Sequence, residues 1–178
     1  MQQHPWAEVD AGTATVLELA EPVEVEPSRH GEGDKPDCGA CAAVPDELEV
    51  YRDDLWRVKV LSDRPFAGTA MLVPLRHADG LRGLNEAELA AYGPMVARVE
   101  QALLALPTSV TFRGAKVARV HSHLWNDGGA HLHQWFFPRP YGYLQMIGST
   151  LVEWEETLPP STPEQTRAAA AALRGLLA

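Results

Sequence analysis

The stretch Ala130-His131-Leu132-His133-Gln134-Trp135-Phe136-Phe137-Pro138-Arg139 places two imidazoles in an apolar, aromatic segment. Alternate residues of a β-strand point to the same face of a sheet, so His131 and His133 should lie side by side, while Gln134 faces the other way in a structural role. Near neutral pH, histidine serves as a nucleophile, a proton donor or acceptor, or a metal ligand. The stretch therefore predicts a strand over residues 131–137 that carries reactive chemistry on one face.

A second pair of histidines precedes this stretch. Residues 116–125 form a predicted strand in which His121 and His123 share a face. Strand register decides whether the two histidine faces coincide, because a slip of one residue moves every side chain to the opposite face. A two-residue loop at Asp127-Gly128 or Gly128-Gly129 would separate the faces, and a three-residue loop with a glycine bulge would unite them. The polarity pattern favours union, which makes His121 and His123 candidates for proton handling.

The only two cysteines, Cys38 and Cys41, are three residues apart and have three interpretations. A disulfide scaffold is disfavoured, because one bridge would add little to a chain of this size. A redox Cys-x-x-Cys pair normally opens a helix, which Pro36 before the pair and Pro45 after it disfavour. The third interpretation is half of a zinc site, which needs two further ligands to complete a tetrahedron.

Hydrophobic periodicity and turn residues predict an α+β order along the chain. A hairpin is expected over residues 48–61, a buried strand over 69–75, a long helix over 85–106 and a strand over 144–154. Thr162-Pro163-Glu164-Gln165 has the form of a capping box and predicts a last helix with Leu173, Leu176 and Leu177 on its buried side. Weaker patterns predict strands at 13–19 and 23–26. We expect an extension and connector over 1–37, a main domain over 38–158 and a C-terminal helix over 159–178.

Length and composition limit the classes of partner. A chain of 178 residues with 46% hydrophobic residues can bury the core of one domain. Its net charge of −9 argues against non-specific binding to nucleic acid. No apolar run approaches the roughly 20 residues of a membrane span, and Met1-Gln2-Gln3-His4-Pro5 does not resemble a signal peptide. We therefore expect a cytoplasmic protein without a membrane or nucleic-acid partner.

The order of several short motifs carries a resemblance to a known family. The motifs are Cys38-x-x-Cys41, Val50-Tyr51-Arg52-Asp53-Asp54, Pro65-Phe66-Ala67-Gly68, Leu72-Val73-Pro74-Leu75-Arg76-His77, a helix beginning near Leu84-Asn85-Glu86, Asn126-Asp127-Gly128, His131-Leu132-His133 and Pro138-Arg139. Together they resemble the histidine-triad superfamily, which includes nucleotide hydrolases and transferases and the galactose-1-phosphate uridylyltransferases. The resemblance implies an α+β domain with an antiparallel sheet, one long helix and a C-terminal helix, usually assembled as a homodimer.

The resemblance also implies a reaction and the residues that perform it. His133 would attack the α-phosphate of a nucleotide and form a nucleotidyl-histidine, which water or a second acceptor then cleaves. A backbone carbonyl near His131 could orient the nucleophile. The residues expected to bind nucleotide or phosphate are Asn126, Gly128, Trp135 and Arg139.

Two further expectations follow from the resemblance. A structural zinc ion would be held by Cys38, Cys41, His77 and His131, as in the zinc-bearing branch of the superfamily. A nucleoside monophosphate would bind beside His133, with its base among apolar side chains of the 48–61 hairpin. Trp56 and Phe66 offer an aromatic lining for that cleft.

The chain departs from the family pattern at two places. The pattern is His-x-His-x-His, or His-x-His-x-Gln in the transferase branch, and the third position here is Trp135. Tryptophan has one donor and no acceptor, so it cannot relay a proton as imidazole does. The loop from Asn126 to His131 is also shorter than usual in the family. An alternative function is therefore a nucleotide-binding or regulatory protein with impaired catalysis.

A last alternative belongs to another class of fold. His121 and His123, followed by Asp127 and preceded by Gly114, loosely resemble the metal-binding motif of cupins. Such barrels bind iron, manganese or nickel through histidine and carboxylate ligands. A cupin would explain neither the cysteine pair nor the long helix at 85–106.

Overall fold

A five-stranded antiparallel sheet lies at the centre of the structure, a computed structural model that describes residues 22–33, 38–43 and 45–178. The strand order is β1-β2-β3-β5-β4. The strands are β1 (Glu49–Arg52), β2 (Trp56–Val60), β3 (Ala70–Pro74), β4 (Val117–His123) and β5 (Gln134–Pro140). The predicted α+β class is confirmed, and the cupin alternative is wrong because helices cover an open sheet here.

The hairpin and the buried strand form where the sequence predicts them. Asp53 starts the turn between β1 and β2, since its carboxylate accepts hydrogen bonds from the backbone N–H groups of Leu55 (2.8 Å) and Trp56 (2.6 Å). Every residue of β3 is buried, as expected for a continuous apolar run. The predicted strand at 23–26 is absent from the described part of the chain, and the one at 13–19 lies outside it.

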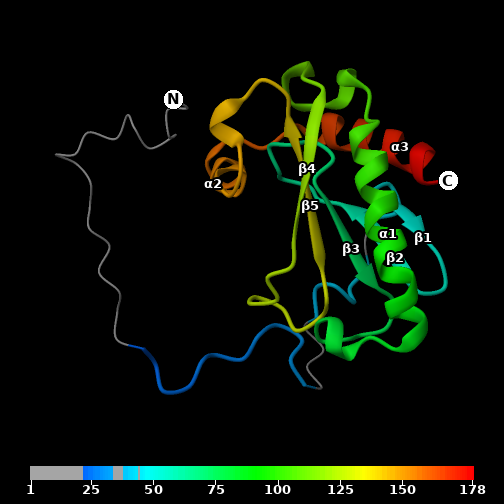
Figure 1. Cartoon of the computed structure of the whole chain (residues 1–178), viewed down its shortest axis with the longest axis vertical. Coiled ribbons are helices and arrows are strands. Elements are labelled where there is room, and N and C mark those ends of the chain that lie inside the picture. Colours follow the sequence, from blue (N-terminus) through cyan, green and yellow to red (C-terminus); the bar gives the residue numbers. More distant parts are fainter. Residues whose placement is uncertain (1–21, 34–37, 44) are drawn as a thin grey trace.

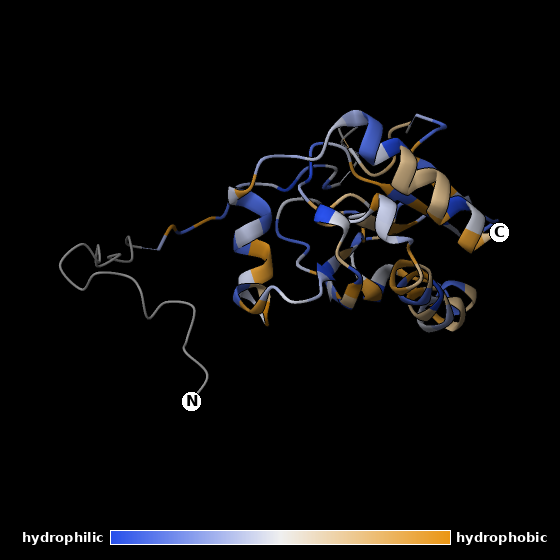
Figure 2. Cartoon of the chain, turned by 90° about the horizontal axis from the view of Figure 1, so that it is seen from above, coloured by the Kyte–Doolittle hydropathy of each residue, from blue (hydrophilic) through white to orange (hydrophobic). Residues whose placement is uncertain are grey.

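Two capped helices cover one face of the sheet (Figure 1). Helix α1 (Glu86–Leu104) begins at a capping box of Asn85 and Glu88, and α3 (Pro163–Leu177) at one of Thr162 and Gln165. Their buried side chains join a core with β1, β2 and β3 that includes Val58, Leu72, Val99, Leu103, Leu173 and Leu177. Helix α3, which ends at the C-terminus, carries both hydrophobic and hydrophilic residues, as the hydropathy colours in Figure 2 show.

The prediction that Leu176 lies on the buried side of α3 is wrong. Leu173 and Leu177 are buried, but Leu176 is 42% exposed. The buried positions of the helix run from Thr166 through Ala169 and Ala170 to Leu173 and Leu177, which follows the spacing of one helical stripe. Leu176 lies beside that stripe, so it remains in contact with solvent.

A third helix replaces the strand predicted over residues 144–154. A 3₁₀ turn (Leu144–Met146) leads into α2 (Thr150–Thr157). Leu151 and Glu155, four residues apart, are both buried, so a helix satisfies this segment by placing them on one face. Leu151 packs with Phe137 of β5, on the side of the sheet opposite α1 and α3 (Figure 1).

None of the helices in the described ranges is long and apolar enough to cross a membrane. Short 3₁₀ turns connect the remaining elements. The turns are Leu81–Gly83, Thr108–Val110 and Phe112–Gly114.

The register of the sheet decides which side chains share the face that α1 and α3 leave uncovered. His123 lies opposite Trp135, and His121 lies opposite Phe137, so these four residues share one face. The connection between β4 and β5 runs over residues 124–133, so both short-loop predictions are wrong. Trp135 and Phe137 share the face of His121 and His123, but His131 and His133 lie in the connection before β5, so the predicted union of the two histidine faces extends only to these aromatic residues. The strand predicted from His131 begins instead at Gln134.

Candidate functional site

Four side chains from three separate segments meet at one end of the sheet. The sulfur of Cys41 lies 3.2 Å from Nδ1 of His131 and 3.4 Å from Nδ1 of His77. The sulfur of Cys38 lies 3.4 Å from Nδ1 of His131. One ligand atom from each of the four residues lies within 4.8 Å of every other. The structure thus brings together the predicted metal ligands, two thiols and two imidazoles.

His131 is oriented so that one ring nitrogen faces the two sulfurs. Its Nε2 donates a hydrogen bond to the carbonyl of Pro74 at 3.0 Å, so Nδ1 carries the lone pair toward Cys38 and Cys41. Burial lowers the pKa of His131 to about 4, which keeps the ring neutral near pH 7. A neutral imidazole whose second nitrogen donates to a carbonyl is the usual form of a metal-bound histidine.

The spacing of the four ligand atoms fits a tetrahedral zinc ion. Zinc bonds to sulfur and nitrogen of ordinary length imply a sulfur–nitrogen separation of about 3.6 Å. The three sulfur–nitrogen separations found here are 3.2, 3.4 and 3.4 Å. Partial desolvation and the neighbouring Cys38 sulfur raise the pKa of the Cys41 thiol. A bound cation favours the thiolate and so would lower this pKa again.

His133 lies two residues beyond this cluster and is oriented by it. Its Nδ1 donates a hydrogen bond of 2.6 Å to the backbone carbonyl of His131. Because a carbonyl can only accept, Nδ1 carries a hydrogen, and in the neutral ring the lone pair therefore lies on Nε2. The carbonyl near His131 that the sequence suggested as an orienting group is therefore in place.

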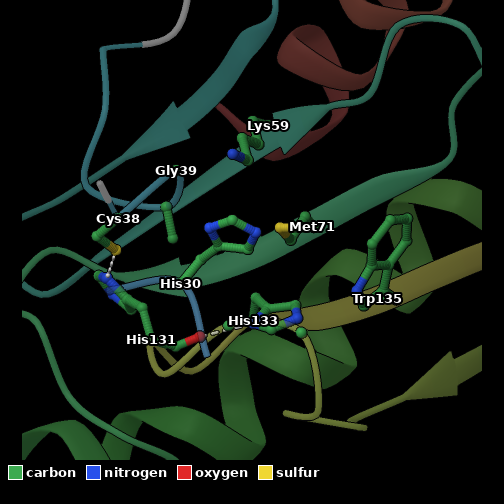
Figure 3. Close-up of a pocket in the computed structure, with 11 residues that line it drawn as sticks. His30, Cys38, Gly39, Lys59, Met71, His131, His133 and Trp135 are labelled. Atoms are coloured by element: carbon green, nitrogen blue, oxygen red, sulfur yellow. Dashed lines mark hydrogen bonds between the residues drawn. The ribbon is translucent and has the colours of Figure 1, made fainter. Parts of the chain in front are cut away.

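A pocket of about 450 Å³ opens beside His133 (Figure 3). It lies on the face of the sheet opposite α1 and α3, between β2, β3, the start of β5 and the loop of Cys38, Gly39 and Ala40. Its lining residues are His30, Cys38, Gly39, Ala40, Lys59, Met71, Gly128, Gly129, His131, His133 and Trp135. Lys59, Met71 and Trp135 are successive cross-strand neighbours, so they form a row across the floor of the pocket.

A short N-terminal segment, residues 29–33, closes one side of the pocket, and we call it the strap. His30 donates its N–H to the carbonyl of Gly128 at 3.2 Å and accepts from the N–H of Ala130 at 2.9 Å. Arg29 binds both carboxylate oxygens of Asp79, at 2.9 and 2.7 Å. The strap is therefore tied to the loop that precedes His131.

Gly128 and Trp135, two of the predicted nucleotide-binding residues, line this pocket. The other two are not among its described lining residues. Asn126 lies in a separate polar hollow beside Asp79, where its carbonyl accepts a hydrogen bond from Arg29 at 3.1 Å. Arg139 lies six residues along β5 from His133, a distance of about 20 Å for an extended strand.

His121 and His123 belong to an aromatic cluster outside the described lining of the pocket. The ring of His123 stacks on Trp125 at 4.8 Å and meets Phe137 edge-on at 5.5 Å. Burial lowers the pKa of both histidines. Trp135 links this cluster to the pocket, since it stacks on Phe137 and carries the Arg64 guanidinium at 5.1 Å from its ring centre.

The predicted aromatic lining of the cleft is wrong. Trp56 packs in the core under α1 and α3, and Phe66 packs beside Phe137; both are fully buried. Lys59 and Met71 were not predicted as site residues, although the alternation of β2 and β3 places them on the face opposite the core residues. His30 was not predicted either, and the sequence carries no local signal for it.

Comparisons with known proteins bear on the fold. No protein-family model matches the sequence, and no curated protein is significantly similar to it. Among solved structures, a histidine triad protein from Bradyrhizobium japonicum superposes with a TM-score of 0.55 at 19% identity, over 76% of this chain and 97% of that one. One from Sinorhizobium meliloti gives 0.54 at 18% identity, over 72% and 87%.

A third similar structure contains a metal. It is a zinc-bound histidine triad family protein from Mycobacterium smegmatis, with a TM-score of 0.50 at 16% identity, over 73% of this chain and 83% of that one. At such identities these similarities establish architecture alone. The chain thus has the fold of the histidine-triad proteins, with a cluster of two cysteines and two histidines able to hold a metal ion and a histidine-lined pocket beside it.

Proposed function

We propose that this protein binds a nucleoside phosphate in the pocket beside His133 and transfers the nucleotidyl group through that histidine. The observation that carries the proposal is the hydrogen bond from Nδ1 of His133 to the His131 carbonyl. It holds the hydrogen on Nδ1, so that the neutral form of the ring has its lone pair on Nε2, and this is the form that attacks phosphorus.

The proposed step forms a bond from Nε2 of His133 to the α-phosphorus and breaks the bond to the leaving group, which departs with the electron pair. The positive charge that develops on the imidazole is stabilised by its Nδ1–H bond to the His131 carbonyl. Water or a second acceptor then attacks phosphorus and releases His133. Gly128 supplies backbone at the pocket wall without a side chain, and Lys59 supplies a cationic amine across the floor, with a pKa lowered by burial.

We further propose that zinc fills the cluster of Cys38, Cys41, His77 and His131 in a structural role. The donor set, the sulfur–nitrogen spacing and the orientation of His131 support it. Four protein ligands leave no open position, so the ion would organise the site and take no direct part in the reaction. It would fix the His131 backbone, and through it the ring of His133.

Trp135 favours a second candidate function within the same fold. Its indole lines the pocket at the third position of the pattern, where it can donate one hydrogen bond but cannot return a proton. A protein with this residue could bind nucleotides with slow turnover. We therefore propose either a nucleotide transferase or hydrolase, the uridylyltransferase-like branch included, or a nucleotide binder with impaired catalysis, and in both cases a cytoplasmic homodimer.

Binding and turnover are tested separately. Titration calorimetry with AMP, GMP and UMP measures binding, and no heat at millimolar ligand would contradict both candidates. Hydrolysis of adenosine 5′-phosphoramidate measures turnover by wild type, His133→Ala and His123→Ala. We expect wild type to be active and His133→Ala to be inactive. Wild type quenched without acid should also show a mass increase of one nucleotidyl group. Binding without turnover would select the second candidate.

Elemental analysis of protein purified without chelators tests the metal. We expect close to one equivalent of zinc per chain, lost in Cys41→Ser. Less than about a tenth of an equivalent would refute the zinc site, since four-ligand structural sites retain their metal through purification. Light scattering of the same sample tests the homodimer.

A further inference from the structure

His30 brings a third imidazole to the pocket from a part of the chain far from the other two. Figure 3 shows its ring among the lining residues, between Lys59 and His133 in that view. The residue is exposed, so the ring borders both the pocket and solvent. It therefore lies where a departing group would leave and where water would enter.

The backbone of His30 is held close to His133. The strap pairs with the loop at Gly129 through a parallel bridge and two backbone hydrogen bonds. A Cβ built on Gly129 would lie 3.6 Å from Cε1 of His133 and 3.9 Å from the carbonyl oxygen of His30. Gly129 thus lies against both residues, and its missing side chain leaves space between them.

The strap is also packed against the cluster of two cysteines and two histidines. Gly31, with φ of +73°, is buried against Cys38, and any Cβ there would lie 2.8 Å from that of Cys38. Arg29, the residue before His30, is held by its paired hydrogen bonds to Asp79. His30 is therefore flanked by two fixed residues, which restricts the positions its ring can reach.

Transfer through His133 needs a second group that handles a proton. An alkoxide or amide leaving group must be protonated as its bond to phosphorus breaks, and the attacking water must later lose a proton. Among the described lining residues, Trp135 cannot accept a proton, and both ring nitrogens of His131 are engaged with Pro74 and the cysteine sulfurs. His30 is an imidazole in the same lining, and imidazole both gives and takes a proton near neutral pH.

We propose that His30 is the acid–base residue of the reaction at His133, an inference that rests on the proposed function. The His30 imidazolium gives its proton to the leaving group as Nε2 of His133 bonds to phosphorus. The neutral His30 ring then takes a proton from the water that attacks the nucleotidyl-histidine, which restores both histidines. The strap supplies the function that Trp135 cannot.

Two substrates with different leaving groups test the role. The amine of adenosine 5′-phosphoramidate must be protonated to leave, whereas p-nitrophenolate leaves the p-nitrophenyl ester of AMP as a stable anion. We expect His30→Gln to lower kcat for the phosphoramidate by about 10² or more, the usual contribution of a general acid. Formation of nucleotidyl-His133 from the p-nitrophenyl ester should change by less than about threefold. That burst of p-nitrophenolate also shows that the variant is folded.

The outcomes separate this inference from the proposed function. Wild type without a burst on the p-nitrophenyl ester would refute both. A burst that His133→Ala abolishes, together with equal rates for His30→Gln and wild type on the phosphoramidate, would overturn the role of His30 alone. If His123→Gln, and not His30→Gln, selectively lowers turnover of the phosphoramidate, the proton transfer belongs to the aromatic cluster. That result would likewise overturn the role of His30.

Discussion

Replacing Gly31 by alanine measures what holds the strap over the pocket. The left-handed backbone of Gly31, φ +73°, costs an alanine about 1 kcal/mol. Its new methyl carbon would lie 2.8 Å from Cβ of Cys38 and 3.2 Å from the Cys38 sulfur. Ordinary contact between such atoms begins near 3.4 Å, so the two segments must separate by about 0.6 Å.

The size of this perturbation matches the interactions it opposes. Overpacking of this kind costs about 1–3 kcal/mol, in addition to the backbone term. The two backbone hydrogen bonds between His30 and the loop at Gly128 and Ala130 contribute about 1 kcal/mol each. We therefore expect the strap to open in Gly31→Ala while the sheet and the cysteine cluster remain folded.

Hydrogen exchange of the His30 and Ala130 amides reads this opening directly. A loss of about 2 kcal/mol of local stability raises both exchange rates roughly 30-fold. Gly33→Ala is the matched control, because φ of +67° imposes a similar backbone cost and no described atom lies within 4 Å of its Cβ. Its rates should rise only about fivefold, for the backbone term alone. Equal protection in the two variants would refute the close packing of Gly31 on Cys38.

Three further outcomes are expected. Leu173→Ala should lower the free energy of unfolding by about 2–5 kcal/mol and Leu176→Ala by less than about 1 kcal/mol, because only Leu173 is buried. Urea unfolding measures both, and equal losses would contradict this packing. Burial raises the pKa of the Glu155 carboxyl above its usual range although Arg64 opposes the shift. Wild type should therefore lose stability relative to Glu155→Gln as the pH rises from the ordinary glutamate range through the raised pKa, and parallel urea midpoints would contradict this. Trp135→His should restore phosphoramidate turnover to His30→Gln, since both positions line one pocket; no recovery would show that they do not exchange roles.

Local patterns in the sequence predicted most of the elements of the fold. The Asp53 turn, the apolar run of β3 and the capping boxes at Asn85 and Thr162 each depend on residues a few positions apart. The four metal-ligand candidates were predicted through the resemblance, because Cys38-x-x-Cys41, His77 and His131 kept the order of the family. Their convergence was confirmed, and the identity of the metal stays a prediction.

The remaining errors arise where tertiary contacts decide. Residues 144–154 contain alternating apolar residues, but the buried pair Leu151 and Glu155 is four residues apart, which selects a helix. Trp56 was expected in the cleft, yet alternation in β2 turns it into the core and presents Lys59 instead. His30 was missed because its place depends on pairing with Gly129, about a hundred residues away, and no local pattern encodes that.

Three of the five tryptophans report on two different regions of the described structure. Trp56 is fully buried in the core, so its emission should shift to longer wavelength only when the whole domain unfolds. Trp135 lines the pocket, and Trp125 lies 6.1 Å from it with the His123 ring stacked on its face. A ligand that enters beside His133 would change the surroundings of this pair and leave Trp56 untouched. Occupancy of the pocket can therefore be followed by fluorescence at protein concentrations too low for calorimetry, without an added label.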